Sequence, residues 1–346
     1  MSDSTNAAAP KGRGTLFQMR FVAIWFAMVG LVIFCAIVAP RSLLPSTFLA
    51  IIPLAAFLAM AAVGEALVIM ARGIDLSIPA VITLSSTVLL GLSGGHDENV
   101  LRGVIGALVC ATAIGLINGF FVAILKLNAL IVTLAIGAVT TGATLWYREA
   151  LPQESRVPPQ MAAWGDERIF GLNLSVWVAA AMIVVLTIVL RKTPVGRRFS
   201  AVGANPRSAW IAGINVSAYQ IASFALAGLL YGVAGILVSA FIRNPTMRVG
   251  DPYLLAPIAA AVLGGTAITG GIGSMIAVGG AALFLTQLGQ VLKMLGLSSA
   301  LQFVIEGVAI ALGMAMVRVN FRQMALMLSG ARSPEKSEAK SGVTPP

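Results

Sequence analysis

Residues 48–95 read FLAIIPLAAFLAMAAVGEALVIMARGIDLSIPAVITLSSTVLLGLSGG, two long apolar runs that are interrupted at Arg72, Gly73 and Asp75. Each run is about 20 residues long, which is the length that an α-helix needs to cross about 30 Å of hydrocarbon. A transmembrane β-strand would instead alternate apolar and polar residues over about ten positions. The stretch therefore predicts two membrane-spanning helices joined by a polar break.

The same pattern continues on both sides of this stretch. Of the 346 residues, 58% are hydrophobic and only 10% are charged, whereas a soluble domain averages about 25% charged residues. The composition excludes a soluble globular protein and predicts an all-α fold, a polytopic helical membrane protein with broken helices. Windows of about 19 residues give about ten spans, at Phe21–Ala39, Phe48–Ala71, Leu76–Gly94, Leu101–Leu125, Ala129–Tyr147, Leu174–Leu190, Ala218–Phe241, Leu254–Gly264, Ser274–Leu292 and Ala300–Val317.

The distribution of basic residues predicts the orientation. Ten spans place both termini on one side, and with the termini inside, the outer side keeps only eight of the 23 Lys and Arg residues. Those eight are offset there by seven acidic residues, among them Asp251. By the positive-inside rule, residues 1–20 and 318–346 are cytoplasmic tails around a transmembrane domain at 21–317. The net charge of +10 then reflects topology, and no nucleic-acid partner is expected.

Two segments between spans are longer than a turn. The inner one, residues 191–216, reads RKTPVGRRFSAVGANPRSAWIAGINV: it begins with basic residues, has a turn signal at 203–206 and then a stretch at 207–212 that favours a short helix. The outer one, residues 148–173, contains three prolines and mixed charge. It is expected either to meet a partner or to cap the helix bundle.

Several kinds of site are absent from the sequence. The glycine-rich run GGTAITGGIG at 264–273 contains no lysine, so it is not a Walker A loop that would bind ATP. Cys35 and Cys110 lie in apolar runs, and the single histidine, His96, lies in a polar loop. These residues predict no disulfide, no metal site and no histidine-based catalysis. The chain is therefore expected not to be an enzyme and to bind no cofactor itself.

Breaks in helices and buried polar residues are the candidates for a transport pathway. The first break contains Gly73 and Asp75, and the glycine run forms a second break, with Gly265 and Gly271, at a comparable point of the second half. Discontinuous helices are common where transporters hold their substrate. Charged or amide side chains at membrane depth are costly unless they face a cavity or a partner, and the residues of this kind are Glu65, Asn118, Gln287 and Glu306.

Four blocks carry a resemblance to a known family. They are VGEALVIMARGIDLS (63–77), LNALIVTLAIGAVTTGAT (127–144), VGANPRSAWIAGINV (202–216) and LLAPIAAAVLGGTAITGGIGS (254–274). In this order they resemble the signature blocks of permease subunits of bacterial ABC importers of the ribose and simple-sugar type, within the branched-chain amino acid/ribose permease superfamily. The chain departs from that pattern at Pro79 and at Trp210, among other positions.

The resemblance implies a multi-pass subunit of the bacterial inner membrane that pairs with a second copy or a paralogue. It implies a periplasmic solute-binding protein and cytoplasmic ABC ATPase subunits as partners, with ATP and Mg²⁺ on the ATPase. The residues that it assigns to ATPase coupling are Gly203, Asn205, Arg207, Ala209 and Gly213.

The implied solute is a small polar molecule, a monosaccharide first, with a nucleoside, a polyol or an amino-acid derivative as alternatives. Two other classes stay open: a proton-coupled carrier that uses Glu65 or Glu306, and a membrane scaffold that transports nothing.

Overall fold

The computed structural model describes residues 13–151, 156–298, 300–302, 304–305, 307–308 and 311. Within them the regular secondary structure is helical apart from one two-stranded hairpin. The α-helices are α1 (Arg13–Val38), α2 (Pro45–Met70), α3 (Ile78–Ser93), α4 (Val100–Ala123), α5 (Ala129–Glu149), α6 (Pro159–Asp166), α7 (Leu174–Lys192), α8 (Pro194–Ala204), α9 (Pro206–Ile211), α10 (Val216–Ile242), α11 (Ala256–Leu263) and α12 (Met275–Met294). The short elements are η1 (Pro40–Leu43), η2 (Asp97–Asn99), η3 (Asp251–Tyr253), β1 (Arg168–Ile169) and β2 (Leu172–Asn173).

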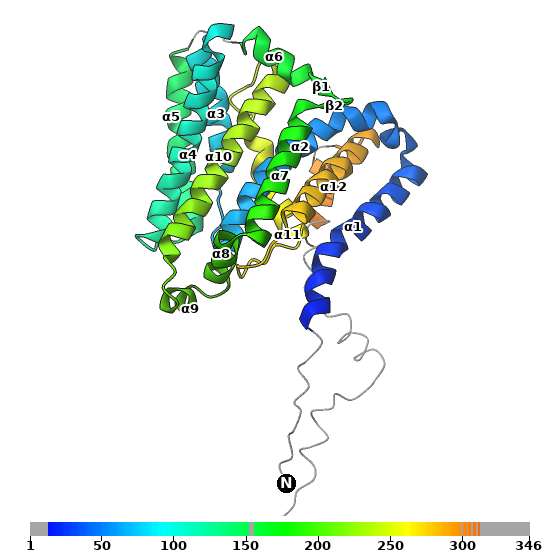
Figure 1. Cartoon of the computed structure of the whole chain (residues 1–346). Helices are drawn as coiled ribbons and strands as arrows, with labels where there is room; N and C mark the ends of the chain where they lie inside the picture. The colour runs from blue at the N-terminus through cyan, green and yellow to red at the C-terminus, as the bar shows by residue number, and fades with distance from the viewer. Residues whose placement is uncertain are drawn as a thin grey trace, which may run out of the picture.

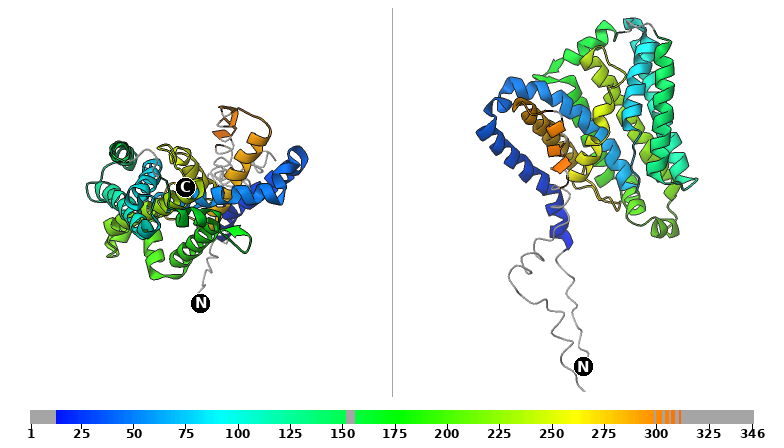
Figure 2. Two further views of the ribbon diagram at one scale, coloured as in Figure 1. Left: turned by 90° about the horizontal axis from the view of Figure 1, so that it is seen from above. Right: turned by 180° about the vertical axis from the view of Figure 1, so that it is seen from behind.

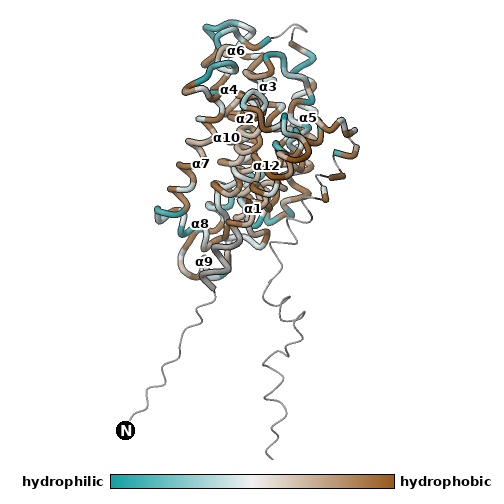
Figure 3. Tube along the Cα trace, turned by 90° about the vertical axis from the view of Figure 1, so that its right-hand side faces the viewer, coloured by the Kyte–Doolittle hydropathy of each residue, from teal (hydrophilic) through white to brown (hydrophobic). Residues whose placement is uncertain are grey.

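The long helices run back and forth between two ends of the molecule (Figure 1). One end carries α6 and the β1–β2 hairpin, and the opposite end carries α8 and α9; we call them the α6 end and the α9 end. The Cα trace coloured by hydropathy shows hydrophilic segments gathered at both ends and hydrophobic helices between them (Figure 3). This distribution is what a bilayer requires, and the multi-pass helical fold predicted from the composition is confirmed.

Seven of the described helices are long and apolar enough to cross a membrane: α1, α2, α4, α5, α7, α10 and α12. The spans expected at 76–94 and 254–264 are shorter in the structure. With 16 and eight residues, α3 and α11 are about 24 Å and 12 Å long at 1.5 Å per residue, so α11 is a half-helix. Ten of the 18 residues of the span expected at 300–317 lie outside the described residues, and the count of ten spans stays a prediction.

Helices α2 and α10 form the centre of the bundle. Seen from behind, α2 crosses the molecule diagonally between α1 on one side and α5 on the other (Figure 2). At the crossing with α10, a Cβ added to Gly64 would lie 2.7 Å from the ring of Tyr231. A Cβ on Gly119 of α4 would lie 2.8 Å from the Cα of Ile221 of α10. Small residues therefore let these backbones approach closely, as is usual between helices in membranes.

Polar residues mark where many of the helices begin. Asparagine side chains accept a hydrogen bond from a backbone N–H in the first turn of α5, α7, α9 and α10, and Thr193 does the same for α8. Such N-caps satisfy donors that the helix itself leaves unpaired. Helices α8 and α9 fill the inner segment, and α9 is the short helix expected at 207–212. The outer segment folds into α6 and the hairpin, whose turn at Phe170 and Gly171 has positive φ at both positions, as a type I′ turn requires.

Candidate functional site

The loop between α2 and α3 folds back into the bundle and meets Glu65 of α2. The backbone N–H of Asp75 donates to the Glu65 carboxylate at 3.2 and 3.3 Å, and the Tyr231 hydroxyl of α10 donates to Oε2 at 3.3 Å. Glu65, Asp75 and Tyr231 are all almost completely buried. The first predicted break is thus a loop that folds back along α2 and is held there by a carboxylate ten residues earlier.

The other carboxylate of this cluster organises the start of α3. Asp75 Oδ1 accepts hydrogen bonds from the backbone N–H of Ser77 at 2.8 Å and from its hydroxyl at 2.6 Å. Asn118 of α4 donates to the Ser77 hydroxyl at 2.9 Å, while its own Oδ1 has no hydrogen-bond partner among the described residues. On the far side of the loop, Thr133 of α5 accepts from the backbone N–H of Leu76 at 3.0 Å.

We call Glu65, Asp75, Ser77, Asn118 and Tyr231 the buried polar cluster. It joins four segments of the chain: α2, the loop that leads into α3, α4 and α10. In the described part of the chain, the two ion pairs involve other residues, so the two carboxylates are held by neutral donors. Because unpaired buried polar groups are expensive, these bonds fix the loop in one position.

A second site lies at the α9 end, where three chain segments meet. The Arg72 guanidinium donates to the carbonyl oxygens of Gly203 at 2.7 Å and Ala204 at 2.6 Å, at the end of α8. The backbone N–H of Gly271 donates to the Met70 carbonyl at 2.9 Å. We call Met70, Arg72, Gly203, Ala204 and Gly271 the junction.

The junction brings together both predicted helix breaks and the predicted coupling segment. Arg72 has a φ of 71°, Gly265 one of 84° and Gly271 one of 78°, and such angles are easy for glycine but strained for arginine. A Cβ on Gly203 would lie 2.5 Å from the Gly271 nitrogen. Gly73, the remaining break residue, is packed against the ring of Phe224.

Helix α9 projects from the junction toward the solvent at the α9 end (Figure 1). Asn205 caps it by accepting from the backbone N–H of Ser208 at 3.1 Å, and Gly213 follows it with a φ of 78°. Ala209 is buried, but Trp210 and Ile211 are 71% and 72% exposed. Arg207 is exposed beside them.

Two predicted pathway residues lie elsewhere. Gln287 of α12 is buried, with its amide nitrogen 3.8 Å from Cys35 Sγ and 3.5 Å from the Ser42 carbonyl. It therefore packs against α1 and η1, outside the buried polar cluster. Glu306 lies outside the described residues.

Sequence reasoning missed several residues of these two sites. Ser77, Thr133 and Tyr231 are common polar residues, and their positions in the sequence do not predict their hydrogen-bond partners. Arg72 was predicted as part of the first break, but its hydrogen bonds to the end of α8 were not. No group of three or more His, Cys, Asp or Glu residues in the described parts of the chain is placed to hold a metal ion.

Comparison with known proteins identifies similar chains. The family model described as branched-chain amino acid transport system / permease component matches residues 47–330. The ribose import permease of Bacillus subtilis is 33% identical over 83% of this chain and 89% of its own length. The corresponding protein of Escherichia coli K12 is 34% identical over 73% and 80%, and the L-arabinose transport system permease of that strain is 29% identical over 88% and 92%. No solved structure matches this chain.

Proposed function

This chain belongs to the family of branched-chain amino acid transport system permease components, and from that premise we propose that it is the permease subunit of a binding-protein-dependent ABC importer for a monosaccharide. As a member of that family with seven apolar helices long enough to span, it is a multi-pass inner-membrane protein. The observation that carries the solute class is the similarity, over most of the chain, to permeases named for two different pentoses, ribose and arabinose. We infer that ATP and Mg²⁺ bind to a separate cytoplasmic ATPase and that a periplasmic binding protein delivers the solute.

The exposed face of α9 supports ATPase docking at this end. Trp210 and Ile211 are large apolar side chains that are mostly exposed at the α9 end, where the basic loops favour the cytoplasm. A buried aromatic anchor is typical of protein interfaces. In this proposal Arg207, Trp210 and Ile211 contact the ATPase, whereas Gly203, Asn205, Ala209 and Gly213 shape the segment that presents them.

The junction supports a route by which ATPase movement reaches the membrane helices. Arg72 and Gly271 bond the end of α8 and the end of α2, and each belongs to one of the two breaks. A displacement of α8 and α9 then pulls on both breaks, because the Arg72 side chain is bonded to the end of α8 and the Gly271 backbone to the end of α2. The buried polar cluster holds the other side of the first break, and its Glu65 and Asn118 line the polar interior in this proposal. Glu306 stays a prediction from the sequence.

The experiment is co-purification of the tagged chain from native membranes in mild detergent, followed by uptake of labelled ribose and arabinose into proteoliposomes that contain the co-purified partners. We expect a stoichiometric ATPase and uptake that needs ATP and resists an uncoupler. Trp210→Glu is expected to abolish ATPase association, while Phe170→Glu does not, although Phe170 is an equally hydrophobic side chain that is 92% exposed at the α6 end. If no ATPase co-purifies and an uncoupler abolishes uptake, the chain is a proton-coupled carrier and this proposal is wrong.

A further inference from the structure

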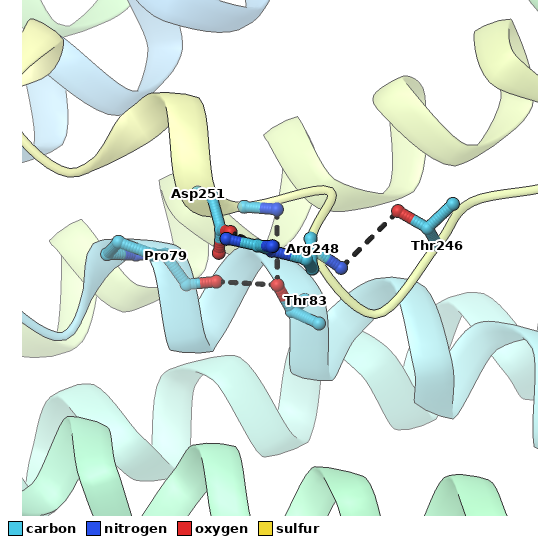
Figure 4. A network of polar contacts seen from close by, with 6 residues as sticks. Pro79, Thr83, Thr246, Arg248 and Asp251 are labelled. Carbon is cyan, nitrogen blue, oxygen red and sulfur yellow. Dashed lines mark hydrogen bonds and ion pairs between the residues drawn. The ribbon is translucent and has the colours of Figure 1, made fainter.

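The loop that connects α10 to η3 descends from the α6 end into the middle of the bundle. At its start, Arg243 pairs with Asp166 of α6, and both side chains are exposed at the α6 end. Seven residues later, the Gly250 backbone N–H donates to the Thr83 hydroxyl of α3 at 3.2 Å, and Thr83 donates to the Pro79 carbonyl at 2.8 Å. Figure 4 shows the loop seated on this part of α3.

The position of Thr83 on α3 gives the depth of the loop. Thr83 lies ten residues before Ser93, the last residue of α3 at the α6 end, which is about 15 Å along the helix axis. The hydrocarbon core of a bilayer is about 30 Å thick. With the end of α3 at the membrane surface, Gly250 lies near the midplane. A Cβ on it would be 2.7 Å from the Thr83 hydroxyl, so the loop lies directly against α3.

The ion pair of Arg248 and Asp251 lies at this depth. Arg248 Nε donates to Asp251 Oδ2 at 2.7 Å, and the two side chains are 86% and 52% exposed. The sequence predicted Asp251 on the outer side of the membrane, because hydropathy shows polarity but not depth. Charged groups that faced lipid at the midplane would cost several kcal/mol each. Their exposure on this chain indicates that this surface faces water.

The bonding of the pair leaves hydrogen-bonding capacity free. Among the described residues, the only side-chain bond of either group is the one between Nε and Oδ2. The two terminal nitrogens of the guanidinium and Asp251 Oδ1 can therefore bind a ligand. Together they offer adjacent donors and acceptors with a net charge of zero, which suits two neighbouring hydroxyls of a neutral polyol better than it suits an ion.

We propose that Arg248 and Asp251 line the solute pathway halfway through the membrane and bind neighbouring hydroxyl groups of a neutral sugar as it passes. This inference rests on the proposed transport function. The buried neighbours Val249 and Gly250 position the pair, since they anchor the loop on the bundle while the two charged side chains stay exposed.

Thiol labelling tests whether the pair faces water, independently of any transport. In a background of Cys35→Ala and Cys110→Ala, Arg248→Cys and Asp251→Cys are treated in the assembled complex with a charged, membrane-impermeant methanethiosulfonate reagent. Val109→Cys is the matched control, because Val109 of α4 is 61% exposed and lies nine residues from the α6 end of α4, at nearly the same depth. We expect both pathway cysteines to react, ribose or arabinose to slow the reaction, and Val109→Cys not to react. Pathway cysteines as unreactive as the control would overturn the proposal and indicate that a second copy or lipid covers the pair.

Uptake then tests whether the solute uses the pair. Arg248→Met and Asp251→Asn are each expected to lower ATP-driven uptake at least about tenfold, the equivalent of one lost hydrogen bond to a charged group, with ATPase association unchanged. Unchanged uptake in these two variants, with reactive cysteines, would also overturn the proposal. If Gln290→Leu loses uptake instead, the pathway runs through a neighbouring cavity of about 330 Å³, which Gln290 helps to line. A wild-type complex that binds no ATPase contradicts the proposed function, while the labelling result still decides this inference.

Discussion

Replacing Gly203 by alanine is the most direct way to disturb the junction. Gly203 is buried where the end of α8 meets the end of α2 and the glycine-rich break. The new methyl group would lie far inside contact distance of the Met70 carbonyl oxygen, 2.5 Å from the Gly271 nitrogen and 2.8 Å from its Cα. All three neighbours are backbone atoms, so no side chain can rotate away, and the segments themselves have to separate.

The cost follows from the bonds that cross this contact. Ordinary contact with a Cβ begins at 3.4 Å, so the Met70 carbonyl has to move by well over an ångström relative to α8. The Gly271–Met70 hydrogen bond, now 2.9 Å, and the Arg72 bonds to α8 stretch with it. Overpacking costs about 1–3 kcal/mol and a weakened buried hydrogen bond about 1–2 kcal/mol, so we expect a loss of about 2–5 kcal/mol.

The assay has two readouts on the purified complex. Thermal unfolding of Gly203→Ala in detergent is expected at a clearly lower temperature than that of the parent, and sugar uptake per ATP hydrolysed is expected to fall. Gly142→Ala is the control, because a Cβ there meets nothing within 4 Å and alanine favours the helix. If Gly203→Ala unfolds and transports like Gly142→Ala, the three segments are not held together as described, and the reasoning on coupling fails with them.

Three further substitutions test the packing and the polar contacts. Tyr231→Phe removes a donor to the buried carboxylate and is expected to cost about 1–2 kcal/mol in thermal or denaturant unfolding, whereas Tyr219→Phe, whose hydroxyl bonds no described residue, should leave stability unchanged. Gly228→Ala forces α10 away from α4 and is expected to destabilise the protein by about 1–3 kcal/mol. Gly30→Ala, with open space around its Cβ, should leave stability unchanged, and equal unfolding temperatures of the two variants would contradict the close crossing. Arg72→Met keeps the apolar stem but loses the bonds to α8, so sugar uptake should fall while ATPase association, measured by co-purification, persists; unchanged uptake would remove Arg72 from the coupling route.

The sequence predicted those features that depend on local composition. The apolar runs marked the long helices, since each needs only its own residues to satisfy its backbone in lipid. Arg72, Gly73 and Asp75 marked the first break, and the turn signal at 203–206 marked the step from α8 to α9. The interruption of the apolar pattern before 254 was visible too, but it was interpreted as an outer loop followed by a short span.

Contacts between distant segments were beyond such reasoning. Glu65 was a pathway candidate because it is charged, but its partner Tyr231 lies 166 residues away, and Gln287 was grouped with it although it faces α1. Ala209 matched the coupling pattern, yet the exposed side chains beside it are Trp210 and Ile211. In each case the residue type was visible and its surroundings were not.

The sequence by itself determined that this chain is a helical membrane protein with two breaks, because the cost of burying charge and unpaired backbone in hydrocarbon acts residue by residue and is recorded in composition and periodicity. Only the tertiary structure decided that both breaks meet the end of α8, that the Asp75 backbone is bonded to Glu65, and that the loop with Arg248 and Asp251 lies against α3. Those arrangements follow from which helices pack together and how far each connecting loop descends, and such relations between remote segments leave no local trace in the order of the residues.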